Sequence, residues 1–344
     1  MFLNTELFGH QRGASNKGYK KIKYGTMVLS TQNLHLGNAN VNLRFDHGMV
    51  SPAYKTYVIT GCSVDLIAQW IKSDAAKRFF YNATTVGASV CRRNVEWDTL
   101  YEQSLYLPCR DEQEKVAKFL GLLSNRINKQ QRFVSALKKY KRGVTAKLIA
   151  AIEEKYPVVR LGDHVTVMRG GSPRPIDAYI TNAENGIRWI KIGDALPDQL
   201  YISDTKEKIK PEGAKKSRRV YAGDLILSNS MSFGRPYILK VDGCIHDGWL
   251  LIRDEEKKFD KRFLCFYLAS DVTLAQYKKY AAGSCVNNLN SELVASVEIG
   301  MPPIEQQIRM ANILEKIDRQ VEAASTMYLL LSKLRSSLLQ QLFI

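Results

Sequence analysis

Paired cysteines and long apolar runs are both missing from this chain of 344 residues. Its six cysteines form no Cys-x-x-Cys pair and no even framework, which is typical of free thiols in a reducing compartment. No apolar run approaches the ~20 residues that a membrane-spanning helix needs, and Met1-Phe2-Leu3-Asn4 does not begin a signal peptide. We therefore expect a soluble, cytoplasmic protein.

Residues for metal and nucleotide chemistry are also scarce. The five histidines are scattered, and Cys244-Ile245-His246 has no two further ligands at usable spacing. Neither a Walker loop nor a Gly-x-Gly-x-x-Gly loop occurs. The sequence thus predicts no cofactor, no metal and no catalytic residue.

Two short motifs imitate enzymes. Asp247 with Glu255-Glu256-Lys257 imitates the spacing of metal-dependent nucleases, and Met301-Pro302-Pro303-Ile304 imitates the Pro-Pro loop of amino-methyltransferases. The first motif lies between a predicted strand and helix, where a solvated charged turn is the ordinary outcome, whereas Mg²⁺ ligands must be held rigidly. The second has Met301 where Asn or Asp is needed. A nuclease that uses Asp247 and Glu255 is therefore only the third-ranked hypothesis.

Positive charge is what the chain has in abundance, with 50 Lys and Arg against 34 Asp and Glu and a net charge of +16. The basic residues are spread along the sequence rather than gathered in a tail. This distribution favours folded surfaces that meet a polyanion, with nucleic acid as the first candidate and an acidic protein as the second.

An apolar seam that advances by alternating steps of four and three residues occurs twice, and each position of the second copy lies 194 residues after its equivalent in the first. Each copy spans 33 residues, or about 50 Å of helix at ~1.5 Å per residue, and its spacing is that of a coiled coil. The polar exception recurs too, because Lys141 maps onto Arg335, and Gln113 recurs as Gln307. The apolar seam residues are Val116, Leu120, Leu123, Ile127, Val134, Leu137, Val144 and Leu148 in the first copy, and Met310, Leu314, Ile317, Val321, Tyr328, Leu331, Leu338 and Leu342 in the second.

The repeated seam predicts an internal duplication in which the two long helices pair with each other. Ordinary core helices of two domains, and a zipper between two copies of the chain, remain alternatives.

A mixed α+β segment precedes each long helix, so α+β is the expected fold class. Gly25–Ser30 resembles Gly223–Ser228, and Gly87–Val90 resembles Gly283–Val286, which indicates that domain and helix are duplicated together. We expect a first domain over residues 1–107, a first helix over 108–152, a second domain over 153–301 and a second helix over 302–344. The first domain is short, because it has no counterpart to residues 156 to about 198.

In the second domain the apolar patterning predicts strands and one long helix. The strands are expected at Arg188–Ile192, Leu225–Ser228, Tyr237–Val241 and Trp249–Ile252, and the helix at Arg262–Tyr280.

Several loops combine glycine or serine with planar or cationic donors, which suit phosphates and base edges. In the loop 169–174 the glycines permit close backbone approach in a flexible loop, and two arginines flank them. Candidate DNA contacts in the second domain are Arg169, Gly170, Gly171, Ser172, Arg174, Lys215, Lys216, Arg218, Arg219, Asn229, Ser230, Ser232, Arg235, Asn287 and Asn288. Those in the first domain are Lys20, Lys21, Lys23, Gln32, Asn33, Arg92, Arg93 and Asn94. We expect Arg174, Asn229 and Arg235 to address base edges, and the run 215–219 to hold phosphates.

The whole arrangement resembles the specificity (S) subunit of type I restriction-modification systems. The resemblance rests on Glu305-Gln306-Gln307 with Ala311-Asn312-Ile313-Leu314, on the opening Leu161-Gly162-Asp163, on Gly170-Gly171-Ser172-Pro173 and on Ser51-Pro52-Ala53-Tyr54. It covers nearly the whole chain.

This resemblance implies two target recognition domains that each read half of an interrupted DNA site in the major groove. It also implies that the two helices pack antiparallel as a spacer, that two methyltransferase subunits dock on the spacer, and that a translocating restriction subunit joins them. The first domain departs from the family pattern, since it lacks an equivalent of the Gly170-Gly171 loop. For this reason self-association of the chain also stays open.

We therefore expect a non-catalytic, sequence-specific DNA-binding subunit. The alternative from another class is a coiled-coil scaffold, such as a truncated and dimerising S-like protein, that organises partners without reading sequence. Salt-dependent binding to one bipartite sequence separates these two hypotheses.

Overall fold

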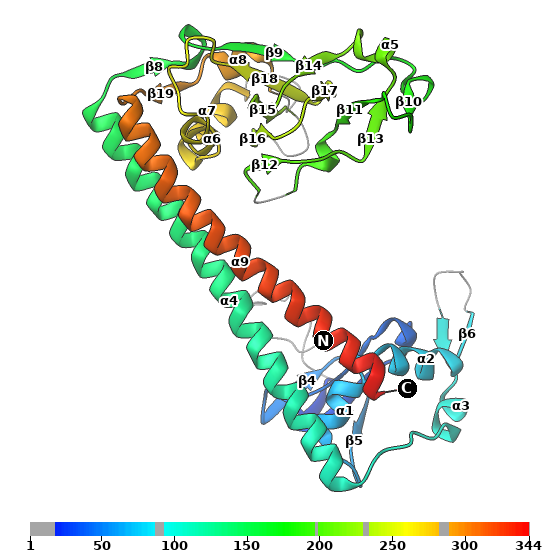
Figure 1. The fold of residues 1–344 in the computed structure, drawn as a ribbon. Helices are drawn as coiled ribbons and strands as arrows, with labels where there is room; N and C mark the ends of the chain where they lie inside the picture. Colours follow the sequence, from blue (N-terminus) through cyan, green and yellow to red (C-terminus); the bar gives the residue numbers. More distant parts are fainter. Residues whose placement is uncertain (1–17, 87–92, 197–198, 230–233, 282–288, 344) are drawn as a thin grey trace. The chain divides into compact units, whose positions relative to one another are not determined.

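A computed structural model describes residues 18–86, 93–196, 199–229, 234–281 and 289–343, and the chain divides into two compact units. The first unit combines the residues up to Gln131 with those from Thr326 onward, and the second runs from Arg132 to Ser325. The chain has two long helices, α4 (Arg110–Lys155) and α9 (Ile304–Leu342), which run side by side (Figure 1). Each of them belongs partly to the first unit and partly to the second. None of the described helices has both the length and the apolar character that a bilayer crossing requires.

The predicted seam residues of α4 and α9 are buried or partly buried, with one exception. Leu120 and Leu314 are fully buried. Leu342, however, is 44 % exposed, whereas Leu339 is 5 % exposed. Including Leu342 in the seam was therefore wrong: it is the last residue of α9, and no further turn continues the seam beyond it.

Contacts between α4 and α9 occur within each unit. In the second unit Lys141 of α4 forms an ion pair with Asp318 of α9. In the first unit Arg335 Nε of α9 donates a hydrogen bond to Ser124 Oγ of α4 over 3.0 Å. Arg335 Nη2 also donates to Gln69 Oε1 over 2.7 Å, which ties α9 to the domain of the first unit.

The first unit contains a three-stranded sheet with two helices packed on it. The central strand β2 (Thr26–Ser30) pairs antiparallel with β3 (Ala39–Val41) and β5 (Tyr54–Val58). The helices α1 (Val64–Trp70) and α2 (Asp74–Asn82) begin at serine N-caps, and their apolar sides share a core with β2 and β3. The other elements are β1 (Lys20–Lys23), a 3₁₀ turn (Leu34–Leu36), β4 (His47–Val50), β6 (Thr84–Val86), β7 (Arg93–Val95) and α3 (Trp97–Glu102).

The second unit contains two five-stranded sheets, each of mixed direction. One has the order β12-β16-β15-β18-β9, and the other has the order β10-β13-β11-β17-β14. The strands of the first are β12 (Tyr201–Ile202), β16 (Pro236–Leu239), β15 (Leu225–Ser228), β18 (Trp249–Arg253) and β9 (Thr166–Arg169). Those of the second are β10 (Ile180–Thr181), β13 (Glu207–Ile209), β11 (Ile187–Ile190), β17 (Gly243–Ile245) and β14 (Arg218–Val220). The remaining elements are β8 (Val158–Arg160), β19 (Glu298–Gly300), α5 (Pro211–Ala214), α8 (Ser291–Ala295) and 3₁₀ turns at Leu161–Asp163, Ile176–Ala178 and Ile192–Asp194.

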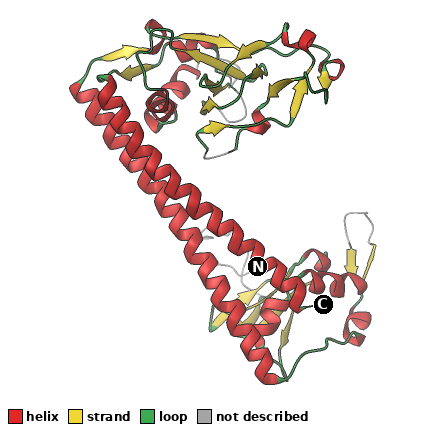
Figure 2. Cartoon of the chain, in the orientation of Figure 1, coloured by secondary structure: helices red, strands yellow, loops and turns green. Residues whose placement is uncertain are grey.

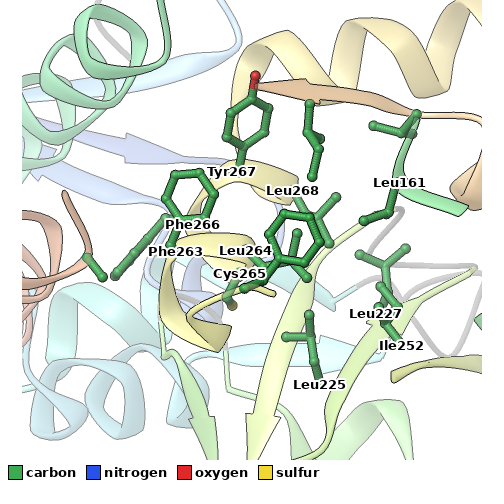
Figure 3. Close-up of a cluster of buried hydrophobic side chains, with 14 of the residues drawn as sticks. Leu161, Leu225, Leu227, Ile252, Phe263, Leu264, Cys265, Phe266, Tyr267 and Leu268 are labelled. Atoms are coloured by element: carbon green, nitrogen blue, oxygen red, sulfur yellow. The ribbon is translucent and has the colours of Figure 1, made fainter. Parts of the chain in front are cut away.

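Helix α6 (Lys261–Leu268) forms the centre of the second unit's core. Its N-cap Asp260 accepts hydrogen bonds from the backbone N–H groups of Arg262 and Phe263. All residues from Phe263 to Leu268 are buried, and they lie beside Leu225 and neighbouring strand residues (Figure 3). The same cluster includes apolar residues of α4 and α9, so the domain and its part of the helix pair share one core.

The mixed α/β architecture agrees with the expected fold class (Figure 2). The four predicted strands are found as β11, β15, β16 and β18. The single helix expected at Arg262–Tyr280 is instead two helices, α6 and α7 (Asp271–Ala281). The break occurs because Ser270 caps the second helix, where Thr273 N donates to Ser270 Oγ over 3.3 Å.

Candidate nucleic-acid interface

Three stretches of the second unit converge on the turn between β17 and β18, residues 246–248. The loop after β9 reaches this turn because Arg169 is the strand partner of Leu250 in β18. The end of β15 reaches it because Ser228 pairs with Trp249. The stretch before β14 reaches it because β14 pairs with β17. Sheet register thus gathers residues that are distant in the sequence.

Gly170 holds the first of these loops against the turn. Its backbone N donates to Trp249 O over 2.8 Å, and Gly171 N donates to Ile245 O over 3.2 Å. A Cβ on Gly170 would lie 2.2 Å from the carbonyl oxygen of His246. Glycine is therefore required at position 170 by packing of the chain on itself, and the DNA contact expected for Gly170 stays a prediction.

The carboxylate of Asp247 is at the centre of the converging loops. Its Oδ1 accepts a hydrogen bond from Ser172 Oγ over 2.8 Å and faces His246 Nε2 at 3.0 Å. Its Oδ2 lies 3.5 Å from Arg174 Nη2. The side chain of Arg174 is 81 % exposed, so Asp247 restrains it on one side and leaves its remaining donors accessible.

The backbone carbonyl of Asp247 holds two further side chains, Arg169 Nε at 3.2 Å and Asn229 Nδ2 at 2.9 Å. Asn229 is only 4 % exposed. Its backbone N donates to Gly248 O, and its O accepts from Leu289 N. Asn229 therefore ties the end of β15 to the turn 246–248, and the base-edge contact predicted for it does not fit its burial.

Hydrogen bonds also bear on the tautomer of His246 and on the ionisation of Asp247. Gly248 N donates to His246 Nδ1 over 2.9 Å, so the proton of the neutral imidazole lies on Nε2, which faces Asp247. Partial burial acts to raise the pKa of Asp247, but the hydrogen bond from Ser172 and the positive charges nearby lower it below its ordinary value. Asp247 is therefore ionised at neutral pH.

The basic run 215–219 borders the same loops. Its cationic side chains, all of them exposed, are Lys215, Lys216, Arg218 and Arg219. Ser217 anchors the run, because its Oγ donates to Gly171 O over 2.7 Å and lies 3.2 Å from Ile245 O. Arg218 Nε donates to Arg169 O over 3.2 Å. Cations fixed beside an exposed loop are suited to DNA phosphates.

Arg235 lies at a different place in the second unit. Its backbone N donates to Ser228 Oγ over 3.0 Å. Its side chain lines a cleft with Lys138 and Arg142 of α4. We therefore separate Arg235 from the base-edge candidates around Asp247.

Candidate residues of the first unit are in part used to hold their own domain together. Arg93 donates to Oγ1 and O of Thr84 over 2.8 and 2.6 Å, and its guanidinium lies over the Tyr81 ring. Asn33 Oδ1 accepts from Arg93 N over 2.9 Å. Lys20 Nζ donates to a backbone carbonyl, that of Tyr54, over 2.6 Å. These three candidates thus have structural partners.

The exposed candidates of the first unit are Lys21, Lys23, Gln32 and Asn94. Five candidates lie outside the described residues: Arg92, Ser230, Ser232, Asn287 and Asn288.

The nuclease-like motif does not form a metal site in the described part of the chain. No group of three or more His, Cys, Asp or Glu side chains there could hold a metal ion. Asp247 is engaged by Ser172 and Arg174, whereas Glu255 is exposed in the turn after β18.

Sequence reasoning missed the structural roles of His246 and Asp247. The local signal, an Asp-Gly pair between two apolar strands, is typical of any turn. It gave no indication that this turn organises the site.

A family model for the type I restriction modification DNA specificity domain matches residues 153–327. The protein named as the type I restriction enzyme MjaX specificity subunit of Methanocaldococcus jannaschii is 24 % identical over 346 residues, which cover 94 % of this chain and 73 % of that protein. The type I restriction enzyme MjaVIII specificity subunit of the same organism is 24 % identical over 277 residues, which cover 72 % of this chain and 62 % of that protein.

Two solved structures have a similar fold. The S subunit of a type I restriction-modification system from M. genitalium matches with a TM-score of 0.61 and 13 % identity, over 97 % of this chain and 86 % of that one. A chain from work on complex assembly and conformational transition of the type I R-M system matches with a TM-score of 0.59 and 18 % identity, over 96 % and 85 %. At these identities the likeness concerns the fold alone.

The family match covers just over half of the chain and confirms the resemblance read from the sequence. Its relatives are specificity subunits, which are non-catalytic. The chain therefore belongs to the type I restriction-modification DNA specificity family.

Proposed function

We propose that this chain is the DNA-binding subunit of a type I restriction-modification complex, that it reads an interrupted DNA target, and that it docks two methyltransferase subunits. Residues 1–107 and 153–301 are the proposed target recognition domains, and residues 108–152 and 302–344 are the proposed spacer helices. A translocating restriction subunit joins the complex through the methyltransferase subunits.

The observation that carries this proposal is the set of loops around Asp247. Arg174 is restrained by a carboxylate and otherwise exposed, which suits a guanidinium that must meet a base edge. A bidentate contact of this kind contributes ~1–3 kcal/mol of discrimination between bases. The exposed cations of the run 215–219 lie beside it and supply phosphate contacts, as the net charge of +16 also favours.

Two buried glutamines support the duplication of the domains. Gln113 Oε1 accepts from the backbone N of Ser63, the N-cap of α1, over 2.8 Å. Gln307 Oε1 accepts from the backbone N of Asp260, the N-cap of α6, over 2.9 Å. Each glutamine also donates to the carbonyl of the proline five positions earlier, over 2.9 Å. The repeat in the sequence thus extends to the contacts between helix and domain.

The central sheets support the same duplication. Gly25 and Gly223 both have a positive φ, of 82° and 88°, shortly before the central strands β2 and β15. β2 lies between β3 and β5 as β15 lies between β16 and β18. β18 has one more neighbour, β9, whose loop carries Arg174, whereas β5 has no second neighbour in the described part of the first unit. We therefore assign the base-reading loop to the second domain, since only that domain has this loop among the described residues.

Two equivalent contacts support antiparallel pairing of α4 and α9. Lys141 pairs with Asp318, and Arg335 pairs with Ser124. Arg335 is the equivalent of Lys141 in the second copy, and Asp318 is the equivalent of Ser124, each 194 residues later. The same pair of equivalent positions is therefore in contact twice, once with the basic residue on α4 and once with it on α9. As the residue number rises along α4 from Ser124 to Lys141, the number of the contacted residue on α9 falls from Arg335 to Asp318, which is the antiparallel order.

Exposed apolar side chains on both helices support two docking sites. Phe119, Phe133 and Tyr140 of α4 recur 194 residues later as Ile313, Met327 and Leu334 of α9, and all six are between 46 % and 60 % exposed. The first unit contains positions 119, 327 and 334, and the second contains the equivalent positions 313, 133 and 140. Exposed apolar groups of this kind mark interaction sites, and their recurrence favours two equivalent partners.

Mapping of methylated bases tests the proposal, after co-purification of the chain with the methyltransferase subunit of the proposed complex. We expect methylation at one interrupted sequence. Arg174→Ala should relax the sequence of one half-site and leave the other unchanged. Arg160→Ala, which removes an exposed arginine of β8, is the matched control and should leave both half-sites unchanged. The proposal would be refuted if methylation showed no sequence preference, or if it showed the same preference without this chain.

A further inference from the structure

The first unit has its own version of the turn that carries Asp247. β1 pairs antiparallel with β4 in the first unit, and β14 pairs antiparallel with β17 in the second. A turn of three residues follows in both units, residues 51–53 after β4 and residues 246–248 after β17. Each turn leads into the strand beside the central strand of its sheet, β5 in the first unit and β18 in the second. The two turns therefore have the same place in the topology of their domains.

Equivalent hydrogen bonds hold the two turns. Tyr54 N donates to Ser51 O over 3.1 Å in the first unit. Trp249 N donates to His246 O over 3.0 Å in the second. In both turns the first side chain also accepts a hydrogen bond from the backbone N two positions later, over 3.4 Å in the first unit and 2.9 Å in the second. The two turns thus agree residue by residue, with Ser51 in the place of His246.

The carbonyl after each turn is bonded by a different donor in the two units. In the second unit Trp249 O accepts from Gly170 N of the loop 169–174 over 2.8 Å. In the described part of the first unit no strand with such a loop pairs with β5, and Tyr54 O accepts from Lys20 Nζ over 2.6 Å. The ammonium group of Lys20 therefore lies where the second unit has the loop that carries its base-reading candidate.

The first turn also differs from the second in what can restrain a cation. Pro52 corresponds to Asp247, and a proline has no carboxylate that could hold a guanidinium. A backbone carbonyl restrains Lys20 instead. An ammonium group has three N–H donors, and this bond uses one of them. Lysine is one of the two side chains that read the O6 and N7 atoms of guanine in the major groove.

We propose that Lys20 is the base-reading residue of the first domain and that it contacts O6 and N7 of a guanine in the target DNA. The inference rests on the proposed function and deepens it. It names the residue, and the base, for the half-site whose domain has no counterpart to the Arg174 loop among the described residues. The two domains then read their half-sites with different groups, an ammonium held by a carbonyl and a guanidinium held by a carboxylate.

Methylation mapping and DNA binding by the complex of the full chain with its methyltransferase test this inference. Arg174→Ala identifies the half-site of the second domain, so the other half-site belongs to the first. Lys20→Ala should relax one guanine position of that other half-site. It should also weaken binding to the wild-type target about tenfold, which is ~1.4 kcal/mol and lies within the range for a contact of this kind.

Modified DNA tests the same contact without any change to the protein. Duplexes in which 7-deazaguanine, which lacks N7, replaces each guanine of the first half-site in turn are compared by fluorescence anisotropy. One replacement should weaken binding by the wild type and leave binding by Lys20→Ala unchanged. If no replacement weakens binding by the wild type, the inference is overturned even where Lys20→Ala does not fold.

The matched control is Lys23→Ala, which removes an exposed lysine at the other end of β1 and changes the net charge equally. It should leave both half-sites unchanged. The inference is overturned if Lys20→Ala leaves both half-sites unchanged, if it relaxes the same half-site as Arg174→Ala, or if the first half-site contains no guanine. The proposed function survives each of these results. Absence of a sequence preference in the wild-type complex would instead refute the proposed function, and this inference with it.

Discussion

Asp247 gathers donors from separate stretches of the second unit. Ser172 and His246 meet its carboxylate, and Asn229 meets its carbonyl. Ionisation matters for this role, since only a carboxylate attracts Arg174 electrostatically. The pKa of Asp247 is lowered, so the charge is kept at neutral pH and is lost only under acidic conditions, as pH falls through that lowered pKa.

Asp247→Ala should weaken binding to the target DNA about tenfold. Loss of the acceptor leaves partly buried donors unpaired, at a cost of ~1–3 kcal/mol, and ~1.4 kcal/mol corresponds to tenfold in affinity. Fluorescence anisotropy with a target duplex measures the change. Asp204→Ala removes a carboxylate that is 81 % exposed in the same unit and changes the net charge equally, so it should bind at least as tightly as the wild type. Equal dissociation constants for Asp247→Ala and the wild type would contradict the role of Asp247.

The sequence predicted which loops carry polar and basic side chains, but it did not predict which residues those side chains bond to. The loop 169–174 stood out because glycine, serine and arginine occur together. The hydrogen bond between Ser172 and Asp247 spans 75 positions and depends on the register of β9 against β18. Such a register leaves no local signal, which is why Asp247 resembled a nuclease residue and Asn229 a base-reading one.

At the scale of elements, the long helices were predictable because apolar residues at heptad spacing lie on one face of a helix, the face that is buried against a partner helix. Their ends were less so: Leu342 fits the spacing and is exposed, whereas Leu339 does not fit and is buried. Gln113 and Gln307 also recur at the same offset in the sequence, and the structure supplies the reason. The side chain of each glutamine accepts a hydrogen bond from the backbone N of a helix N-cap residue in the preceding domain.

Gln307→Ala should lower the free energy of unfolding of the second unit. Gln307 is 1 % exposed; it accepts from Asp260 N and donates to the carbonyls of Pro302 and Lys258 over 2.9 and 3.1 Å. A buried group left unpaired costs ~1–3 kcal/mol. Urea denaturation measures this difference, with Gln306→Ala, at a less buried neighbouring position, as the control. Equal midpoints for the two variants would mean that the repeated glutamine does not fasten the helix.

At the scale of the whole molecule, the proposed duplication gives the chain two of each part: a domain, a spacer helix and an exposed apolar set. The two copies are unequal in one respect that bears on function. Strands β8 to β12, with the loop that carries Arg174, belong to the second unit. This asymmetry was visible in the sequence as a missing counterpart to residues 156 to about 198, but the contribution of β9 to the converging loops required the sheet topology.

The central claim is that paired helices set the distance between two half-sites, and a heptad insertion tests it most directly. Seven residues added to both α4 and α9, after Gln131 and after Ser325, preserve the seam and lengthen each helix by about 10 Å at ~1.5 Å per residue. DNA rises ~3.4 Å per base pair, so methylation mapping should show an unchanged pair of half-sites with a gap longer by about three base pairs. Insertion into α4 alone mismatches the seam and should abolish specific methylation. A gap that stays the same after the double insertion would contradict the account.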